Sequence, residues 1–151
     1  MSVESLRKVK TLCEGVLERW RGRGIAAVYL YGSTLGAWQR PDSDVDIAVL
    51  DLEERPLNWT DQSKLMDELE RALGRAVDLR MVRDCVLSLQ AHIFDRGELV
   101  FVELPTVTET YVQALRRKYE SQEGNRRAAR LTTIRELTSG VGTHDEPRLP
   151  R

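Results

Sequence analysis

The sequence lacks several features that mark secreted or membrane proteins. Only two of its 151 residues are cysteine, Cys13 and Cys85, and they do not form a CxxC pair, which excludes a disulfide framework. No apolar run approaches the ~20 residues that span a bilayer, so we expect no membrane association. The first ten residues, MSVESLRKVK, lack the apolar stretch of a signal peptide, and we therefore expect a cytoplasmic protein.

The chain also has no excess of either charge. It carries 23 Lys and Arg against 24 Asp and Glu, which excludes a protein that grips nucleic acid mainly by its charge, and nucleic acid is not the expected direct substrate. The balance is uneven along the chain. Residues 1–104 have 14 basic and 18 acidic side chains, whereas residues 105–151 have 9 basic and 6 acidic ones. We predict a compact acidic core over residues 1–104 and a basic helical extension over residues 105–151.

Hydrophobic spacing predicts alternating helices and strands in the core. Apolar residues recur at helical spacing up to Trp20, and further helical patterns begin at Thr60 and at Asp84. Runs of β-branched or alternating apolar residues predict strands over residues 25–31, 45–50, 76–82 and 98–103. The order α-β-β-α-β-α-β favours the α/β (α+β) class, with a small mixed sheet flanked by helices.

The extension is predicted to contain two short helices. Thr108 can cap a helix that runs to about Gln122. Gly124-Asn125 is expected to break this helix, and residues 126–138 predict a second one. The chain therefore ends in a helical tail.

The stretch from residue 29 to residue 50 carries the pattern that points to chemistry. A predicted strand runs into Gly32-Ser33, ten residues follow, and Asp44-Val45-Asp46 then begins the next strand. Residues two apart on a strand point to the same face, so the two carboxylates lie side by side. Adjacent carboxylates repel unless a cation lies between them, and Mg²⁺ takes oxygen ligands together with substrate phosphates. Gly32 allows a ligand to approach the backbone closely, and Ser33 offers a hydroxyl and an N–H to an anion.

A third carboxylate lies on another predicted strand. Asp78 is on the polar side of an otherwise apolar alternation. If its strand neighbours the strand of Asp46, three carboxylates converge and can hold two metal ions, or one metal ion beside a base, for in-line phosphoryl or nucleotidyl transfer. A lone Gly-Ser is usually a turn and a lone Asp-x-Asp a solvated edge, but their joint placement at strand ends favours a phosphate and metal site.

This combination resembles the nucleotidyltransferases of the DNA polymerase beta superfamily. The motifs concerned are Gly32-Ser33, Asp44-x-Asp46 and the later Asp78. The short chain is similar to the minimal nucleotidyltransferase (MNT) branch, and within it to the antitoxins that pair with HEPN-domain ribonuclease toxins. The resemblance implies a nucleotidyltransferase core that uses ATP and Mg²⁺, with two ions expected. It also implies AMP transfer to a tyrosine hydroxyl of a HEPN toxin, which neutralises the toxin.

The resemblance also implies a role for each residue that matches the motif. Gly32 and Ser33 would hold the triphosphate, and Asp44 and Asp46 would bind the metal ions. Asp78 would join the metal ions and help to deprotonate the acceptor hydroxyl. The loop departs from the family in one respect, because Leu35 stands where many relatives have an arginine before the second glycine. We expect Arg40 to supply that phosphate contact instead.

Two other functions are compatible with the sequence. One is nucleotide transfer to a small molecule such as an aminoglycoside, although residues 105–151 leave little room for the helical substrate domain of such enzymes. The other is an antitoxin that blocks its toxin by binding alone, against which the intact Gly-Ser and three carboxylates argue. Assembly with copies of itself or with the toxin is left open by the sequence.

Overall fold

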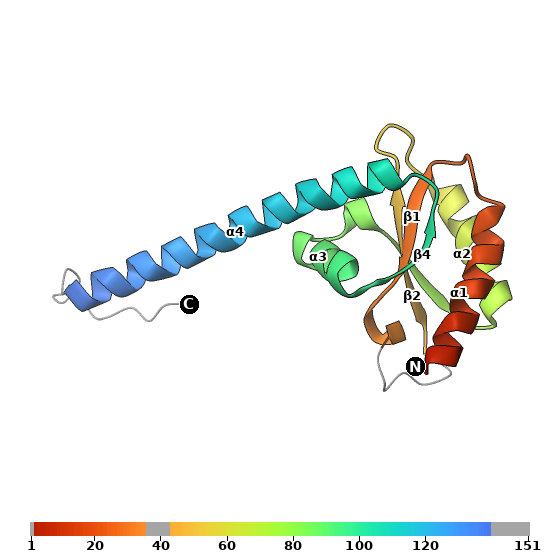
Figure 1. Ribbon diagram of the computed structural model, residues 1–151, viewed down its shortest axis with the longest axis horizontal. Coiled ribbons are helices and arrows are strands. Elements are labelled where there is room, and N and C mark those ends of the chain that lie inside the picture. The colour runs from red at the N-terminus through yellow and green to blue at the C-terminus, as the bar shows by residue number, and fades with distance from the viewer. Residues whose placement is uncertain (1, 36–42, 140–151) are drawn as a thin grey trace.

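The structure, a computed structural model, describes residues 2–35 and 43–139 and centres on a mixed four-stranded sheet (Figure 1). The strand order is β3-β2-β1-β4, and β1 is antiparallel to both β2 and β4, whereas β2 and β3 are parallel. The strands are β1 (Ile25–Leu30), β2 (Val45–Asp51), β3 (Val77–Met81) and β4 (Glu98–Val102). The predicted fold class, strand set and element order are thus confirmed.

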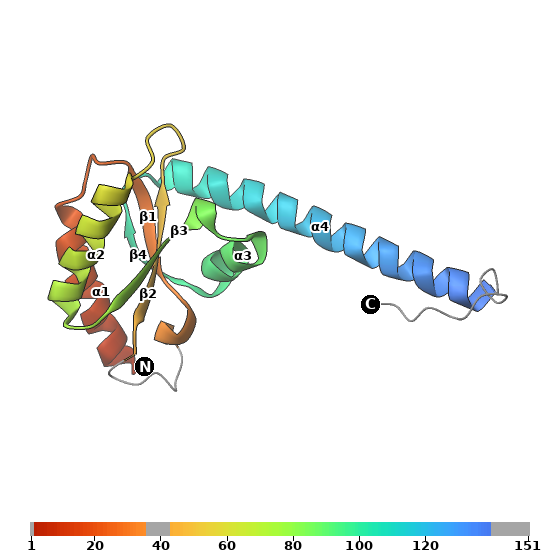
Figure 2. The same ribbon diagram turned by 180° about the vertical axis from the view of Figure 1, so that it is seen from behind.

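Helices cover both faces of the sheet (Figures 1 and 2). On one side lie α1 (Val3–Glu18) and α2 (Trp59–Leu73), and on the other lie α3 (Leu87–Arg96) and the first turns of α4 (Pro105–Ser139). Among the described residues, no helix is long and apolar enough to cross a membrane.

The strand alternation divides the apolar side chains between two clusters. Val45, Ile47 and Val49 are fully buried against α1 and α2. Ala48 and Leu50, on the opposite face of β2, are buried in the second cluster, to which α3 and α4 contribute. Asp46 lies on the same face as Ala48, because residues two apart on a strand share a face. The sheet therefore presents Asp46 on the α3 side, where the residue is half-buried.

Two helix starts differ from their predicted positions. The side chain of Asn58, and not of Thr60, caps α2, because its Oδ1 accepts the amide proton of Asp61 at 2.8 Å. Asp84 does not open α3 but ends a short 3₁₀ turn, η2 (Val82–Asp84). The next two residues are extended, and α3 begins only at Leu87.

The predicted break in the extension is wrong. A single helix, α4, runs from Pro105 to Ser139 and passes through Gly124-Asn125 without interruption. A lone glycine in a helix costs about 1 kcal/mol, too little to end a helix whose backbone hydrogen bonds continue on both sides. Thr108 does not cap the helix: it lies in the first turn, where its hydroxyl donates to the Leu104 carbonyl at 2.9 Å. Beyond its first turns α4 projects away from the sheet (Figure 1).

Candidate functional site

Two of the predicted site residues lie opposite each other on adjacent strands. Asp46 of β2 and Asp78 of β3 are direct partners in the parallel register of these strands. In-register residues of parallel strands point to the same face, so both carboxylates stand on the α3 side, and both residues are half-buried. The convergence of these carboxylates was predicted on the condition that their two strands are neighbours. The sheet order, in which β2 pairs with β3, meets this condition.

The turn after β1 lies against one of these carboxylates. Gly32 begins a short 3₁₀ turn, η1 (Gly32–Leu35), with a φ of +63°. A Cβ atom at this position would lie 2.9 Å from Oδ2 of Asp46, closer than real Cβ contacts come. The adjacent amide of Tyr31 donates to the Asp46 carbonyl at 3.1 Å and ties the turn to β2. Both the backbone angle and the close carboxylate therefore require glycine here.

The segment that carries Asp44 is anchored immediately before β2. The guanidinium of Arg75 donates to the Ser43 carbonyl from Nε at 3.1 Å and from Nη2 at 2.5 Å. The amide of Val45 donates to the Ala76 carbonyl at 2.9 Å. These bonds fix the start of β2, and Asp44 itself is exposed one residue before it.

The structure brings the predicted ligands together only in part. Within residues 2–35 and 43–139, no three His, Cys, Asp or Glu side chains are close enough together to hold a metal ion. Asp46 and Asp78 are paired, whereas the convergence of Asp44 on the same point stays a prediction. Ser33 belongs to η1, immediately after Gly32. Arg40 lies outside the described residues.

Two further residues stand at this site that the sequence reasoning missed. Nε of Arg80 lies 3.5 Å from Oδ2 of Asp78, and the nearby carboxylate raises the pKa of the guanidinium. Tyr31 is buried at the end of β1, and burial raises the pKa of its hydroxyl to about 12. The charge of Arg80 opposes this shift, whereas those of Asp46 and Asp78 add to it, so the Tyr31 hydroxyl interacts with all three charged groups. The Asp-x-Arg spacing on one strand face was a signal for Arg80, but Tyr31 looked like the apolar end of a strand.

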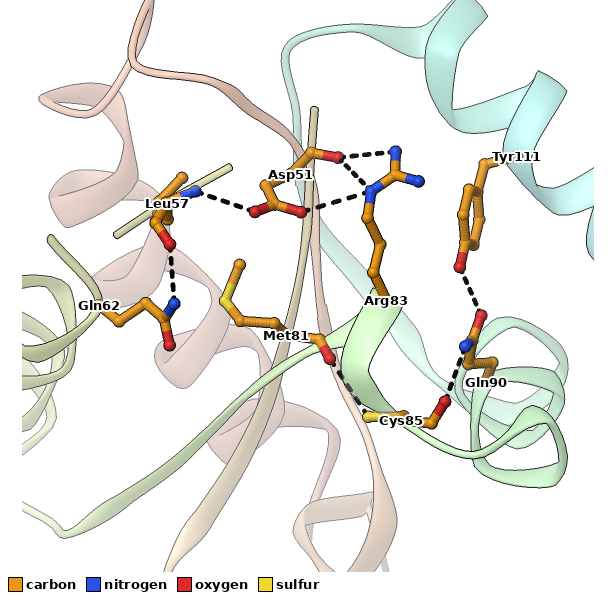
Figure 3. Close-up of polar contacts among 8 residues, drawn as sticks. All are labelled: Asp51, Leu57, Gln62, Met81, Arg83, Cys85, Gln90 and Tyr111. Carbon is orange, nitrogen blue, oxygen red and sulfur yellow. Dashed lines mark hydrogen bonds and ion pairs between the residues drawn. The ribbon is translucent and has the colours of Figure 1, made fainter. Parts of the chain in front are cut away.

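A polar network at the far end of β2 holds the helical layer on the sheet (Figure 3). The buried carboxylate of Asp51 accepts a hydrogen bond from the Leu57 amide at 2.9 Å. The backbone carbonyl of Asp51 accepts hydrogen bonds from Nε and Nη2 of Arg83 at 3.1 and 3.0 Å. The hydroxyl of Tyr111 on α4 donates to Oε1 of Gln90 at 2.5 Å. Nε2 of Gln90 in turn donates to the Cys85 carbonyl at 2.8 Å. These bonds connect α4, α3 and η2 and so fix the end of β3 that carries Arg80.

Comparison with known proteins relates the chain to one family. The family model described as "Polymerase beta, Nucleotidyltransferase" matches residues 17–104. A chain from a structure assigned as a minimal nucleotidyltransferase is 30% identical, with a TM-score of 0.53 and coverage of 65% of this chain and 95% of that one.

Similar folds also occur in toxin–antitoxin complexes. A chain from a toxin–antitoxin structure with AMP-PNP has a TM-score of 0.62 at 23% identity, and the match covers 83% of this chain and 98% of that one. A chain from the complex of tri-AMPylated Shewanella oneidensis HEPN toxin with MNT antitoxin has a TM-score of 0.60 at 20% identity, with coverage of 85% and 98%. No curated protein matches the chain significantly.

Proposed function

Because the chain belongs to the polymerase beta nucleotidyltransferase family, whose model matches more than half of its length, we propose that it transfers AMP from ATP to a tyrosine hydroxyl of a HEPN toxin and thereby neutralises the toxin. The observation that carries the proposal is the pairing of Asp46 with Asp78 beside the Gly32 turn. The similar fold found in a complex of MNT antitoxin with AMPylated HEPN toxin supports this acceptor, and the complex with AMP-PNP supports ATP as the donor.

The paired carboxylates fit a divalent cation. Carboxylate oxygens are the ligands that Mg²⁺ prefers, and two of them face the same side of adjacent strands. Gly32 keeps the space beside Oδ2 of Asp46 free of a side chain, so a cation can come close to that oxygen. We assign Asp44, Asp46 and Asp78 as the residues that would hold the metal ions, two of which are expected. When bound, Mg²⁺ neutralises phosphate charge and polarises the phosphorus that is attacked.

The residues of the chain position the reactants for an in-line displacement. The backbone amides of Gly32 and Ser33 hold the triphosphate, together with the side chain of Arg40. The phenolic oxygen of the acceptor forms a bond to the α-phosphorus, the bond from that phosphorus to the bridging oxygen of the β-phosphate breaks, and pyrophosphate leaves. Asp78 takes the phenolic proton as the new bond forms.

The two predicted parts of the chain have separate tasks in this proposal. Residues 1–104 carry the catalytic groups, and residues 105–151 add contacts to the toxin. Helix α4 leaves the sheet on the side of α3, which is also the face that bears Asp46 (Figure 2). A toxin held against α4 therefore approaches the same side of the sheet as the paired carboxylates.

The proposal is tested by mixing the purified chain with ATP, Mg²⁺ and the HEPN protein encoded by the neighbouring gene. Intact mass should show AMP added to the HEPN protein, and its ribonuclease activity should fall in parallel. The double variant Asp46→Asn, Asp78→Asn should abolish the addition. Asp67→Asn, which changes an exposed aspartate of α2, is the matched control and should leave it intact. Ribonuclease inhibition without any mass change would overturn the proposal in favour of inhibition by binding.

A further inference from the structure

One of the two paired carboxylates already has a cationic neighbour. Nε of Arg80 lies 3.5 Å from Oδ2 of Asp78, and both side chains project from the same face of β3 because they are two residues apart. The Tyr31 hydroxyl interacts electrostatically with Arg80, Asp46 and Asp78. The guanidinium therefore sits within the group of side chains assigned above to nucleotidyl transfer.

A guanidinium in this position and a divalent cation compete for the same carboxylate. Two carboxylates on adjacent strands repel each other, and a positive charge at 3.5 Å relieves this repulsion. A cation with two charges bound to Asp78 is repelled by a guanidinium that stays in place. Binding of the cation therefore includes the loss of the Arg80–Asp78 ion pair.

The Arg80–Asp78 ion pair is partly exposed to solvent and is therefore weak. About half of the Arg80 side chain and 40% of the Asp78 side chain are exposed, so water weakens their attraction. The guanidinium can turn into solvent without uncovering the apolar core. By contrast, Arg83, three residues further along the chain, pairs with the buried Asp51 and is itself only 25% exposed.

We propose that Arg80 is an internal counter-ion of the paired carboxylates, which a divalent cation displaces from Asp78 and which thereby lowers the affinity of the site for that cation. The proposal rests on the proposed function, because it takes Asp46 and Asp78 as metal ligands. Arg80 is in this view a positioning residue: it holds Asp78 beside Asp46 until the cation arrives, and it sets the cation concentration at which the site fills.

The experiment measures the binding of Mn²⁺ alone to the full-length chain, from the electron paramagnetic resonance signal of free Mn²⁺. The variant Arg80→Gln should bind Mn²⁺ about three- to tenfold more tightly than the unchanged chain, since one positive charge has been removed from beside the site. Arg80→Lys keeps the charge and should bind with nearly unchanged affinity. The gain in Arg80→Gln should shrink in about 0.5 M NaCl, which screens exposed charges.

Thermal unfolding supplies a second readout, the dependence of Tm on Mn²⁺. If Arg80 had a purely structural role, the effect of Arg80→Gln on Tm would not depend on Mn²⁺. In EDTA, Arg80→Gln should have a lower Tm than the unchanged chain, and saturating Mn²⁺ should remove most of this difference. Arg21→Gln is the matched control, because it breaks an exposed ion pair with Glu18 on α1, and its effect on Tm should be the same with and without Mn²⁺.

The possible outcomes separate this proposal from the proposed function. Unchanged or weaker Mn²⁺ binding in Arg80→Gln, with binding still lost in the double variant Asp46→Asn, Asp78→Asn, would overturn the role of Arg80 and leave the metal site standing. Mn²⁺ binding that survives in the double aspartate variant would overturn the metal site itself, and both proposals with it. Equal losses of Tm in EDTA and in Mn²⁺ would show that Arg80 only supports the fold.

Discussion

Replacement of Gly32 by alanine should separate backbone strain from damage to the site. The residue has a φ of +63°, and an L-residue in the left-handed region costs roughly 1–2 kcal/mol. For a chain of this size, each kcal/mol lowers Tm by about 2–4 °C. The added Cβ would also lie 2.9 Å from Oδ2 of Asp46 and must push that carboxylate aside. Asp46 is half-buried, so part of its side chain faces solvent and the carboxylate can turn in that direction.

Gly74 provides the matched control for this experiment. It ends α2 with a φ of +65°, nearly the same as that of Gly32, and a Cβ there would meet no atom within 4 Å. Gly74→Ala should therefore lose a similar amount of stability, about 1–2 kcal/mol, without any effect on the site. A displacement of a catalytic group by about 1 Å can cost 10²-fold in rate. We therefore expect Gly32→Ala to transfer AMP about 10- to 100-fold more slowly than Gly74→Ala.

The assay compares initial rates of AMP addition to the HEPN protein with Tm measured on the same preparations. A transfer rate in Gly32→Ala that lies within about threefold of that in Gly74→Ala would refute the reasoning, since the displaced carboxylate would then play no part in catalysis. A loss of stability in Gly32→Ala that exceeds the control by more than about 2 kcal/mol would refute it differently, because Asp46 would then be unable to turn aside.

Three further predictions concern the carboxylates, the core and the end of α4. The double variant Asp44→Asn, Asp46→Asn should abolish transfer while Tm stays unchanged or rises, because a repulsion between neighbouring carboxylates is removed; a large drop in Tm would show that the pair is structural. Burial raises the pKa of the Cys13 thiol to about 12 from 9.0. Above pH 9 the unfolded chain releases this proton and the folded chain keeps it, so the free energy of unfolding should fall by up to about 1.4 kcal/mol per pH unit towards pH 12. Urea unfolding of Cys13→Ala should show a shallower fall between pH 9 and 10. Truncation after Gln122 should leave a folded, ATP-binding chain that captures less HEPN protein in a pulldown than the full-length chain does. Equal capture by the truncated and full-length chains would count against a role for the end of α4.

The sheet could be predicted because its strands are short apolar runs, either continuous, as in β1, or alternating with polar residues, as in β3. Val45, Ile47 and Val49 are apolar and fall on one face, so the face of Asp46 follows from the sequence. The neighbours of a strand do not follow in the same way, because they depend on which crossover the chain makes. Only the observed parallel pairing of β2 with β3 places Asp78 beside Asp46. The adjacency on which the site depends is a property of the topology and not of either motif.

The residues that were missed or misplaced were missed for different physical reasons. Tyr31 acts through contacts between strands, and local sequence patterns do not record which side chains meet across a sheet. The contact of Arg80 with Asp78 lies within β3, so its spacing of two residues was visible in the sequence but was overlooked. Thr60 was expected to cap α2, but the cap lies two residues earlier because the Asn58 side chain reaches the Asp61 amide. At Gly124, turn-forming residues were expected to end a helix that the surrounding residues continue.

Because α4 is a single unbroken helix, its length sets the distance between the sheet and the far end of the helix. Thirty-five helical residues span about 50 Å at about 1.5 Å per residue, so the far end of the helix is held at a set distance and angle from the sheet. One residue inserted near Gly124 would turn everything beyond it by about 100° around the axis, whereas seven inserted residues would restore the angle to within about 20° and only lengthen the reach. Whatever docks along α4 must therefore match the phase of the helix, and not just its composition, to bring a hydroxyl to the paired carboxylates.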